Sequence, residues 1–524
     1  MSSQVNAASQ HRSLSVILIG AGFSGIGLAI HLKQAGMKDF LILEAEGGVG
    51  GTWWINRYPG CACDVQSHLY SLSFQPKTDW SRTFAPRHEI QTYLDQCVKQ
   101  HRLGRHIALN SRVEEAVWDE EKRLWSVRVR GGREYRARVL VSAIGGLSRP
   151  AWPNIPGLSE FPGPVVHSQA WPDSLDVAGK RVAVIGTGAS AIQFVPHLQR
   201  QADRLDLYQR SAQWILPKPD RSIAPWRQAL YRRFPPARRL KRLGLFLLLE
   251  TRLPAFTRFP RLTALHRRKA RRHLESQVSD PTLRARLTPD YAMGCKRVLM
   301  SNDYYPAVAG PNVELVAGGV ERIEGNTLID HRGRRRPADL IVLGTGFRAA
   351  EPVPEGLIRG RDGRDLARCW SQGPRAYKGT AVPGFPNFFT LLGPNTALGH
   401  NSVLLMIEGQ IRYLVSALGW MERHKVDRLE VRPEVEDRWD RRLQRRLKRT
   451  VWNTGGCSSW YRHPESGRIP TLWPRFTFTF RWLLRRFDPA AYTVVAREPV
   501  EDDLRPGPAA PPDIRSPTPG RSGD

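Results

Sequence analysis

Two glycine turns with the same local pattern constrain the fold of this chain more than any other feature. The first turn, 20–25, follows an apolar, β-prone run at 14–19 and leads into an apolar helical stretch at 26–34, after which a second strand, 40–43, ends at Glu44. Glycines allow the backbone to approach a pyrophosphate, and a carboxylate at this position accepts hydrogen bonds from a ribose. The pattern therefore predicts a dinucleotide site made by Gly20, Gly22, Phe23, Ser24, Gly25 and Glu44.

The second glycine turn repeats this pattern with one difference. It follows the strand-like run 180–185, precedes a helix that reaches about residue 200, and is followed by a strand at 205–208. At the spacing where the first fold has Glu44, the second has Arg210. An arginine suits a 2′-phosphate, and the missing carboxylate removes the usual ribose partner of NAD, although a surface arginine in a plain NAD site remains the alternative. We expect FAD or NAD in the first fold, and NADP in the second at Gly186, Thr187, Gly188, Ala189, Ser190 and Arg210.

Two such folds in one chain imply two dinucleotides, and a flavin with a nicotinamide is the usual reason to hold two together. The predicted fold class is therefore α/β, with two Rossmann-like domains for FAD and NADP and a helical, Arg-rich insertion at about 220–290. No third glycine fingerprint follows residue 376, so we expect the last part of the chain to complete the first domain. The predicted boundaries are a flexible N-terminus at 1–13, an FAD domain at 14–150 and 376–498, an NADP domain at 151–375, and a disordered tail at 499–524.

The segment 161–172 joins the two folds. It is too rich in Pro and Gly for a helix, and its apolar pair Val165-Val166 is too short to predict a strand, so composition alone indicates a rigid linker with a buried Trp. Its pattern F-x-G-x-x-x-H-x-x-x-W-P, however, resembles the fingerprint of type I Baeyer–Villiger monooxygenases. Every defined position is met, by Phe161, Gly163, His167, Trp171 and Pro172. We expect His167 and Trp171 to couple the two domains and not to touch the substrate.

The resemblance extends over about residues 14–485 and implies a mechanism. It includes the segments 50–54, 56–60, 67–70, 296–297, 344–347 and 459–461. In this family NADPH reduces FAD, O2 adds to give a C4a-peroxyflavin, and a ketone becomes an ester or lactone. A fixed cation suits the anions of this reaction, and arginine cannot lose its proton. By resemblance Arg297 is that cation, and Asp64 is its acidic partner. The alternative for Arg297 is a phosphate or surface contact, and the alternative for Asp64 is a cap of the turn that precedes it.

The resemblance also assigns further cofactor residues. For FAD it implies Gly51, Thr52, Trp53, Asp64, Tyr70 and Val113. For NADP it implies Ser211, Lys296 and Trp460, the last on a mobile loop that closes over the nicotinamide. The sequence after Trp460, at 462–466, departs from the family pattern, so the geometry of this loop is left open.

Two other flavin chemistries compete with ketone oxygenation. Flavin-containing monooxygenases that oxygenate N or S are similar, but they typically lack the Trp-Pro ending. A pyridine-nucleotide–disulfide reductase needs paired cysteines, and Cys61 and Cys63 have the wrong spacing. We therefore predict an enzyme that uses NADPH, O2 and a small hydrophobic ketone, without a metal. Six cysteines in so long a chain do not indicate a disulfide framework, which favours a reducing, cytoplasmic setting.

Much of the net charge of +30 lies in the segment 227–272, which holds about fifteen Lys or Arg and one acid, Glu250. Aromatic residues are interleaved with these cations. The pattern fits a solvated helical surface or a face that contacts an anionic membrane, whereas no repeat or fold motif supports a nucleic-acid partner. The sequence has no run of eighteen apolar residues, so we expect no transmembrane helix, and the polar N-terminus does not predict export. The oligomeric state is not predicted.

Overall fold

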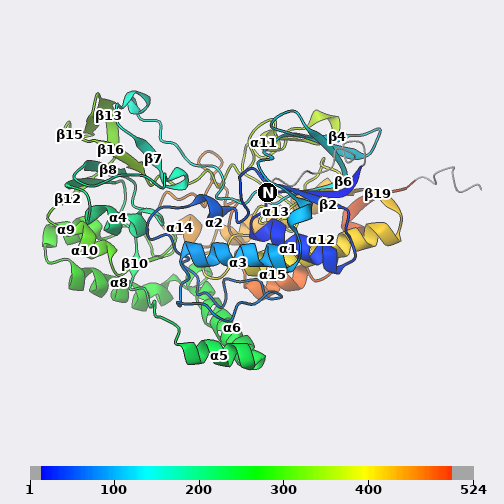
Figure 1. Ribbon diagram of the computed structural model, residues 1–524, viewed down its shortest axis with the longest axis horizontal. Helices are drawn as coiled ribbons and strands as arrows, with labels where there is room; N and C mark the ends of the chain where they lie inside the picture. The colour runs from blue at the N-terminus through cyan, green and yellow to red at the C-terminus, as the bar shows by residue number, and fades with distance from the viewer. Residues whose placement is uncertain (1–12, 498–524) are drawn as a thin grey trace, which may run out of the picture.

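The computed structural model describes residues 13–497. The predicted tail at 499–524 and the predicted flexible N-terminus, apart from Ser13, lie outside the described residues. Figure 1 shows two sheet-containing lobes side by side, with a group of helices extending below them. This arrangement confirms the predicted α/β class with two Rossmann-like folds and a helical insertion.

The first lobe is built on a mixed sheet with the strand order β17-β4-β5-β6-β1-β2-β3, and β18 also pairs with β6. Strands β1, β2, β3 and β6 are mutually parallel, whereas β4, β5 and β6 form an antiparallel meander. The strand bounds are β1 (Leu14–Ile19), β2 (Phe40–Leu43), β3 (Ile107–Ala108), β4 (Val113–Asp119), β5 (Leu124–Val129), β6 (Glu134–Ser142), β17 (Ile358–Arg359) and β18 (Phe388–Thr390). Strand β2 is a continuous apolar run and β1 is apolar except for Ser15, because both faces of a parallel sheet are covered.

Helices α1 (Phe23–Gln34), α3 (Arg87–Gln100) and α12 (Leu404–Arg423) cover one face of this sheet. Helix α1 begins at Phe23, three residues before the predicted start, because the turn passes directly into the helix at Gly22. Strand β18 returns to this sheet beside β6, and β17 joins it beside β4. Strand β17 thus joins the first sheet although it lies before residue 376, the predicted start of the returning segment. The predicted domain boundaries stay a proposal.

The second lobe holds a parallel sheet with the order β12-β9-β8-β16-β7. Its strands are β7 (Val165–His167), β8 (Arg181–Ile185), β9 (Arg204–Gln209), β12 (Val313–Ala317) and β16 (Leu340–Leu343), with helices α4 (Ala191–Gln199) and α10 (Tyr304–Val308) packed on it. The prediction that Val165-Val166 is too short for a strand was wrong. The pair forms an edge strand because β16 supplies a parallel partner, with Val166 opposite Val342 and His167 opposite Leu343.

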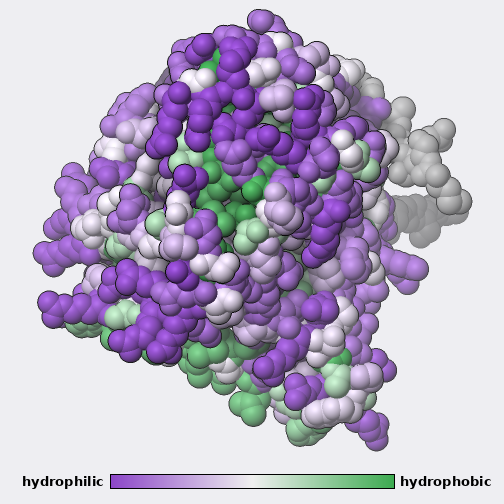
Figure 2. Space-filling model, turned by 90° about the vertical axis from the view of Figure 1, so that its left-hand side faces the viewer, coloured by the Kyte–Doolittle hydropathy of each residue, from purple (hydrophilic) through white to green (hydrophobic). Residues whose placement is uncertain are grey.

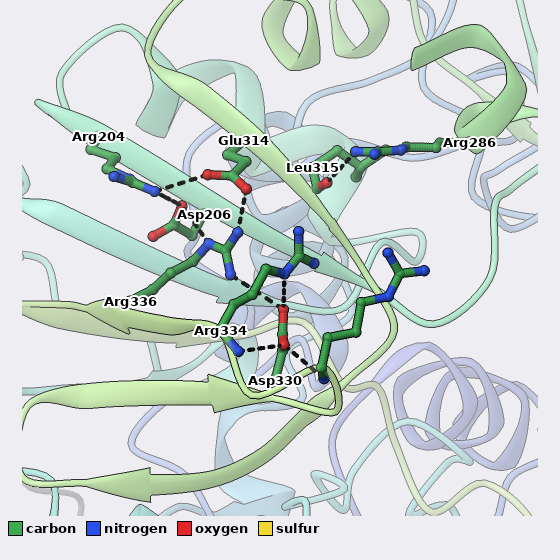
Figure 3. Close-up of polar contacts among 9 residues, drawn as sticks. Arg204, Asp206, Arg286, Glu314, Leu315, Asp330, Arg334 and Arg336 are labelled. Carbon is green, nitrogen blue, oxygen red and sulfur yellow. Dashed lines mark hydrogen bonds and ion pairs between the residues drawn. The ribbon is translucent and has the colours of Figure 1, made fainter. Parts of the chain in front are cut away.

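A small antiparallel sheet packs beside β9 and β12 and is joined to them by buried charges (Figure 3). It consists of β13 (Val320–Glu324), β14 (Thr327–Asp330) and β15 (Arg335–Pro337). Arg336 lies at the centre of the charges: it pairs with Glu314 of β12, with Asp330 of β14 at 3.2 Å and with Asp206 of β9 at 3.7 Å. Only 8% of the Arg336 side chain is exposed, so these carboxylates replace its water.

The helical insertion lies between two short strands that pair in parallel, β10 (Ile215–Leu216) before it and β11 (Leu299–Met300) after it. It consists of α5 (Pro225–Arg233), α6 (Pro235–Glu250), α7 (Leu253–Thr257), α8 (Ala264–Gln277) and α9 (Pro281–Leu287). In Figure 1, α5 and α6 form the lowest part of the molecule. Within residues 13–497, no helix is both long and apolar enough to cross a membrane.

The remaining helices, strands and turns lie in several parts of the molecule. They are α2 (Thr52–Ile55), α11 (Leu366–Cys369), α13 (Pro433–Leu447), α14 (Val451–Thr454), α15 (Thr477–Leu483), the antiparallel pair β19 (Val426–Val431) and β20 (Tyr492–Ala496), and short 3₁₀ turns at 104–106, 158–160, 168–170, 260–263, 361–363 and 489–491. A disulfide joins Cys295 to Cys457. The cysteine spacing did not indicate this bond, because 162 residues separate its two ends.

Candidate functional site

A cavity of about 1330 Å³ lies where the two lobes meet. It exceeds the usual range of roughly 300–1,000 Å³ for a site that holds one small ligand. Its walls come from several parts of the chain: the segments 52–65, 186–193, 344–353, 391–403 and 457–464, with Lys296 and Arg297 between them. The cavity therefore offers room for more than one ligand at the junction of the two folds.

The first glycine turn is shaped by close backbone contacts. Gly20 has φ +106°, and a Cβ there would lie 2.8 Å from the carbonyl oxygen of Ala143. A Cβ on Gly25 would lie only 2.0 Å from the carbonyl oxygen of Gly20. Larger residues at these positions would push the turn away from the sheet, so both glycines keep the start of α1 close to the end of β1.

Glu44 lies beside this turn at the end of β2 and is buried. One carboxylate oxygen accepts a hydrogen bond from the backbone N–H of Ala21 at 2.6 Å, and the other accepts one from Glu46 at 3.0 Å. Burial raises the pKa of Glu44 above its usual value, although these hydrogen bonds oppose the rise. A glycine cradle at a helix N-terminus with an acid at its edge fits a dinucleotide such as FAD.

The other residues predicted to contact the flavin fall into two groups. Gly51 lies directly against the first turn, since a Cβ on it would lie 3.1 Å from the Cα of Gly22. Thr52, Trp53 and Tyr70 line the cavity, and the indole N–H of Trp53 donates to the Tyr70 hydroxyl at 3.1 Å. The structure does not place every predicted residue on the cavity wall: those outside the lining are Gly20, Gly22, Phe23, Ser24, Gly25, Glu44, Gly51 and Val113, the last at the start of β4.

The second glycine turn opens directly into the cavity. Gly186 has φ +110°, and a Cβ there would lie 2.4 Å from the carbonyl oxygen of Gly344. Residues 186–190 all line the cavity. The turn therefore presents the N-terminal end of α4 to the same space that holds Lys296 and Arg297, and it fits the pyrophosphate of a second dinucleotide.

A cluster of cations follows the end of β9. Arg210 and Ser211 line the cavity together with Lys296, whose ammonium donates to the Ser211 hydroxyl. Burial and the charge of Arg210 lower the pKa of Lys296. Across the described residues, no carboxylate lies within ion-pair distance of Arg210 or Lys296. The cluster is therefore an anion site, and an anion there would relieve the repulsion between the two cations.

Asp64 and Arg297 form an ion pair on the cavity wall. The Arg297 Nε donates to an Asp64 oxygen at 2.5 Å, and its Nη1 donates to the carbonyl oxygen of Leu398 at 3.4 Å. The exposed fractions of the two side chains, 29% for Arg297 and 38% for Asp64, face into the cavity that both residues line. Burial alone would raise the pKa of Asp64, but the charge of Arg297 holds it below its usual value, and the pair raises the pKa of Arg297. The site therefore keeps a permanent cation in place.

The sequence did not predict three neighbours of this pair. Lys218 lines the cavity as a further cation, and its charge also lowers the pKa of Asp64. Tyr461 is buried beside Arg297, whose charge opposes the rise that burial causes in the pKa of Tyr461. The disulfide Cys295–Cys457 joins the segment of Lys296 to the loop of Trp460. Of the three, only Tyr461 had a sequence signal, since it belongs to the family-like segment 459–461.

Trp460 lies on the cavity wall with 45% of its surface exposed. Its ring contacts Tyr461 with the ring centroids 4.5 Å apart. The loop thus holds one aromatic side chain in the open part of the cavity and the next one against Arg297.

The fingerprint segment 161–172 belongs to the second lobe through β7 and contacts the first lobe through Trp171, outside the cavity lining. Gly163 is required by space, because a Cβ there would lie 2.5 Å from the carbonyl oxygen of Asp339. His167 is buried at the end of β7, and burial lowers its pKa. The Trp171 ring contacts Tyr58, which precedes Asp64 in the first lobe, and Phe194 of α4 in the second.

The free thiols nearest the site do not favour thiol chemistry. Cys61 and Cys63 are buried and line the cavity. Burial raises the pKa of Cys61 to about 11, and it raises that of Cys63 further. Both therefore stay protonated, whereas a nucleophilic cysteine needs its thiolate.

Comparisons with known proteins agree with this arrangement of two nucleotide sites. A family model described as pyridine nucleotide-disulphide oxidoreductase matches residues 17–237. A Baeyer-Villiger monooxygenase of Pseudomonas aeruginosa is 52% identical over 492 residues, which cover 94% of this chain and 93% of that protein. A Baeyer-Villiger monooxygenase of Streptomyces coelicolor is 46% identical over 94% of each chain.

Solved structures with the same fold also match over nearly the whole chain. Oxidized steroid monooxygenase bound to NADP aligns with a TM-score of 0.81 and 30% identity, covering 93% of this chain and 100% of that one. A closed crystal structure of cyclohexanone monooxygenase aligns with a TM-score of 0.82 and 27% identity, covering 93% and 100%.

Proposed function

This chain belongs to the Baeyer–Villiger monooxygenases, and from that premise we propose which of its residues carry the reaction and what kind of ketone it accepts. It is an FAD-containing enzyme that uses NADPH and O2 to convert a ketone to an ester or lactone. Reduced FAD supplies the activation of O2 on which this chemistry depends. The observation that carries the proposed site is the ion pair of Asp64 and Arg297 on the wall of a cavity that both nucleotide folds share.

Arg297 acts as the fixed cation of the reaction. Insertion of oxygen beside a carbonyl passes through a state in which the former carbonyl oxygen carries negative charge. A guanidinium stabilises this charge without giving up a proton, and in a cavity shielded from water the effect is strong. Arg297 faces the cavity while two of its nitrogens are held by Asp64 and Leu398, so little reorganisation is needed when the charge develops.

Asp64 positions Arg297 and does not contact the ketone. Its carboxylate is ionised, because its pKa lies below the usual value. It accepts the Nε–H of Arg297 and thereby fixes the plane of the guanidinium. Loss of this carboxylate would leave Arg297 charged but free to rotate toward other acceptors.

Arg210, Ser211 and Lys296 hold the 2′-phosphate of NADPH. The supporting observation is that two cations and a hydroxyl meet at the end of β9 with no carboxylate paired to them in the described chain. The turn 186–190 receives the pyrophosphate, and Trp460 covers the nicotinamide. In the first fold, Gly20, Gly22, Gly25 and Glu44 hold the adenosine half of FAD, and Thr52, Trp53 and Tyr70 approach its ring.

The ketone is small and hydrophobic. Aromatic and aliphatic side chains make up much of the cavity wall, among them Trp152, Leu398 and Trp460. A cytoplasmic location, with membrane contact through the basic segment 227–272, is a separate proposal that rests on composition and on the surface of the helical insertion.

Product analysis under labelled oxygen tests the reaction. The FAD-loaded enzyme is incubated with NADPH, ¹⁸O₂ and either cyclohexanone or a long-chain methyl ketone, and the products are separated by gas chromatography with mass spectrometry. We expect a lactone or an ester that carries one ¹⁸O atom. Oxidation of a thioether or tertiary amine with no ketone product would overturn the proposal. NADH in place of NADPH should support a much slower reaction.

A further inference from the structure

Helix α6 has two apolar faces, and only one of them is buried. Leu245 and Leu249 pack into the core, whereas Leu240, Leu243 and Leu247 are exposed at 70%, 50% and 53%. The spacing of three and four residues places these three leucines on one side of the helix. An amphipathic helix of a soluble lobe normally has a polar outer face, so this second apolar stripe has no role within the described chain.

The exposed apolar surface continues on the neighbouring elements. More than half of the large hydrophobic side chains that are exposed in residues 13–497 lie between α5 and α8: Trp226, Leu230, Phe234, Leu240, Leu243, Leu247, Leu248, Phe259, Leu262 and Leu265. We call this set the apolar patch. Figure 2 shows hydrophobic residues gathered along the lower edge of the molecule, where Figure 1 places α5 and α6. A patch of this kind marks an interaction site.

Exposed cations surround the apolar patch and have no acidic partners. Helical spacing places Arg239 and Lys241 on either side of the leucine stripe of α6, and both are exposed. Among residues 13–497, the exposed Lys and Arg side chains of 227–272 have no carboxylate within ion-pair distance. The one acid of this segment, Glu250, is buried and binds His400, Asn401 and the backbone N–H of Thr477. The surface thus combines apolar side chains with uncompensated positive charge.

We propose that this face docks onto the surface of an anionic lipid bilayer. The leucines enter the boundary between headgroups and acyl chains, and the arginines and lysines at their sides reach the lipid phosphates. A second copy of this chain fits poorly, because two such faces would bring their unpaired cations together. A nucleic acid would pair with the cations but would leave the leucines exposed to water.

The helix is rigidly attached to the cavity walls, so docking fixes the orientation of the whole enzyme. Arg242, on the buried side of α6, donates to the carbonyl oxygen of His68 at 2.9 Å, four residues beyond Asp64. At the other end, Glu250 accepts from Asn401, which lines the cavity, at 2.7 Å. The same helix therefore carries the proposed lipid contact on one side and contacts residues at the cavity wall on the other. The docking itself does not depend on the proposed reaction.

Flotation of the full-length, FAD-loaded protein with lipid vesicles tests the proposal. The vesicles contain two parts phosphatidylcholine and one part phosphatidylglycerol, or phosphatidylcholine alone. We expect binding to the anionic vesicles that weakens with salt, and little binding to the neutral ones. The variant L240S/L243S/L247S should lose roughly tenfold in vesicle affinity or more, and R239E/K241E a similar amount, because each removes one of the two contributions.

Matched variants separate docking from general effects. L109S/V494S replaces exposed apolar residues away from the patch, and R441E/R442E changes the net charge by the same amount on α13. Both controls should bind like the wild type, and flavin content and melting temperature should be unchanged in all variants. Absence of vesicle binding, or equal binding by the leucine variant and the wild type, would overturn the proposal. So would a dimer that the leucine variant abolishes, or retention on DNA or RNA that needs the cations but not the leucines.

Discussion

Replacing Arg297 with Met tests whether its charge acts on the ketone and not on the nicotinamide. Met fills a similar space but cannot hydrogen-bond to Asp64 or Leu398, which now hold the guanidinium. In an environment of effective dielectric constant near 20, two unit charges about 4 Å apart interact by about 4 kcal/mol. Since the carbonyl oxygen gains only part of a charge, we expect a loss of about 3 kcal/mol in the transition state, which is a rate decrease of roughly 10²- to 10³-fold.

Two measurements separate this loss from damage to the cofactor sites. Stopped-flow absorbance without oxygen follows the reduction of the flavin by NADPH, and steady-state turnover with gas chromatography follows the ketone product. We expect the reduction rate to stay within about threefold of the wild type while ketone conversion falls by the full amount. Arg128→Met removes an exposed arginine that is paired with Glu115 and serves as the control.

Asp64→Asn extends the same test to the positioning residue. The amide keeps the shape but removes the charge that fixes Arg297, so product formation should fall by less than in Arg297→Met, and the double variant should lose no more than Arg297→Met alone. Retained ester formation in Arg297→Met, or equal losses in flavin reduction and ketone conversion, would refute the reasoning.

Four further perturbations check other parts of the structure. Arg210→Ala should raise the KM for NADPH by roughly 10- to 100-fold, because one charge-assisted hydrogen bond to the 2′-phosphate is lost, and it should leave the KM for NADH unchanged. Equal effects on both KM values would contradict the role of Arg210 in binding this phosphate. Arg336→Met leaves three carboxylates without their buried partner, so urea unfolding should show a loss of about 3–5 kcal/mol. Burial lowers the pKa of Lys378 to about 8, so above that pH the unfolded chain binds more protons than the folded one. The free energy of unfolding should therefore rise between about pH 8 and pH 10, by at most ~3 kcal/mol. Lys378→Met should remove this rise. Cys457→Ser should lower the free energy of unfolding by up to about 5 kcal/mol, because the unfolded chain gains entropy when the loop closed by the disulfide is opened. A reducing agent should lower the stability of the wild type by the same amount and leave the variant unchanged.

The glycine turns were predictable because their geometry depends on residues that are close in sequence. A strand, a turn that only Gly tolerates and a helix start lie within about twenty residues, and Gly20 and Gly186 have the positive φ angles that such turns need. The position of Arg210 was predictable for the same reason. The cation cluster that Arg210 forms with Lys296 was anticipated by resemblance and not from spacing.

Features that depend on distant partners were not predictable. Val165 and Val166 look like part of a linker until β16, about 175 residues later, supplies hydrogen bonds. Arg336 appears in the sequence as one of several exposed-looking arginines, and its burial follows from three carboxylates on three different strands. The exposed leucines of α6 are an intermediate case: the sequence predicted a solvated surface or a membrane face at 227–272, but which side of the helix is uncovered depends on how α6 packs on the rest of the chain.

The disulfide between Cys295 and Cys457 sets the reach of the loop that follows it. Cys457 lies three residues before Trp460, and a fully extended chain covers at most about 3.6 Å per residue, so the Cα of Trp460 lies within roughly 11 Å of the Cα of Cys457. Cys295, the other half of the disulfide, lies two residues before Arg297. The disulfide therefore holds the Cys457 end of the loop beside Arg297, while the buried Tyr461 holds the residue after Trp460. Reduction of the disulfide would remove one of the two attachments that flank Trp460.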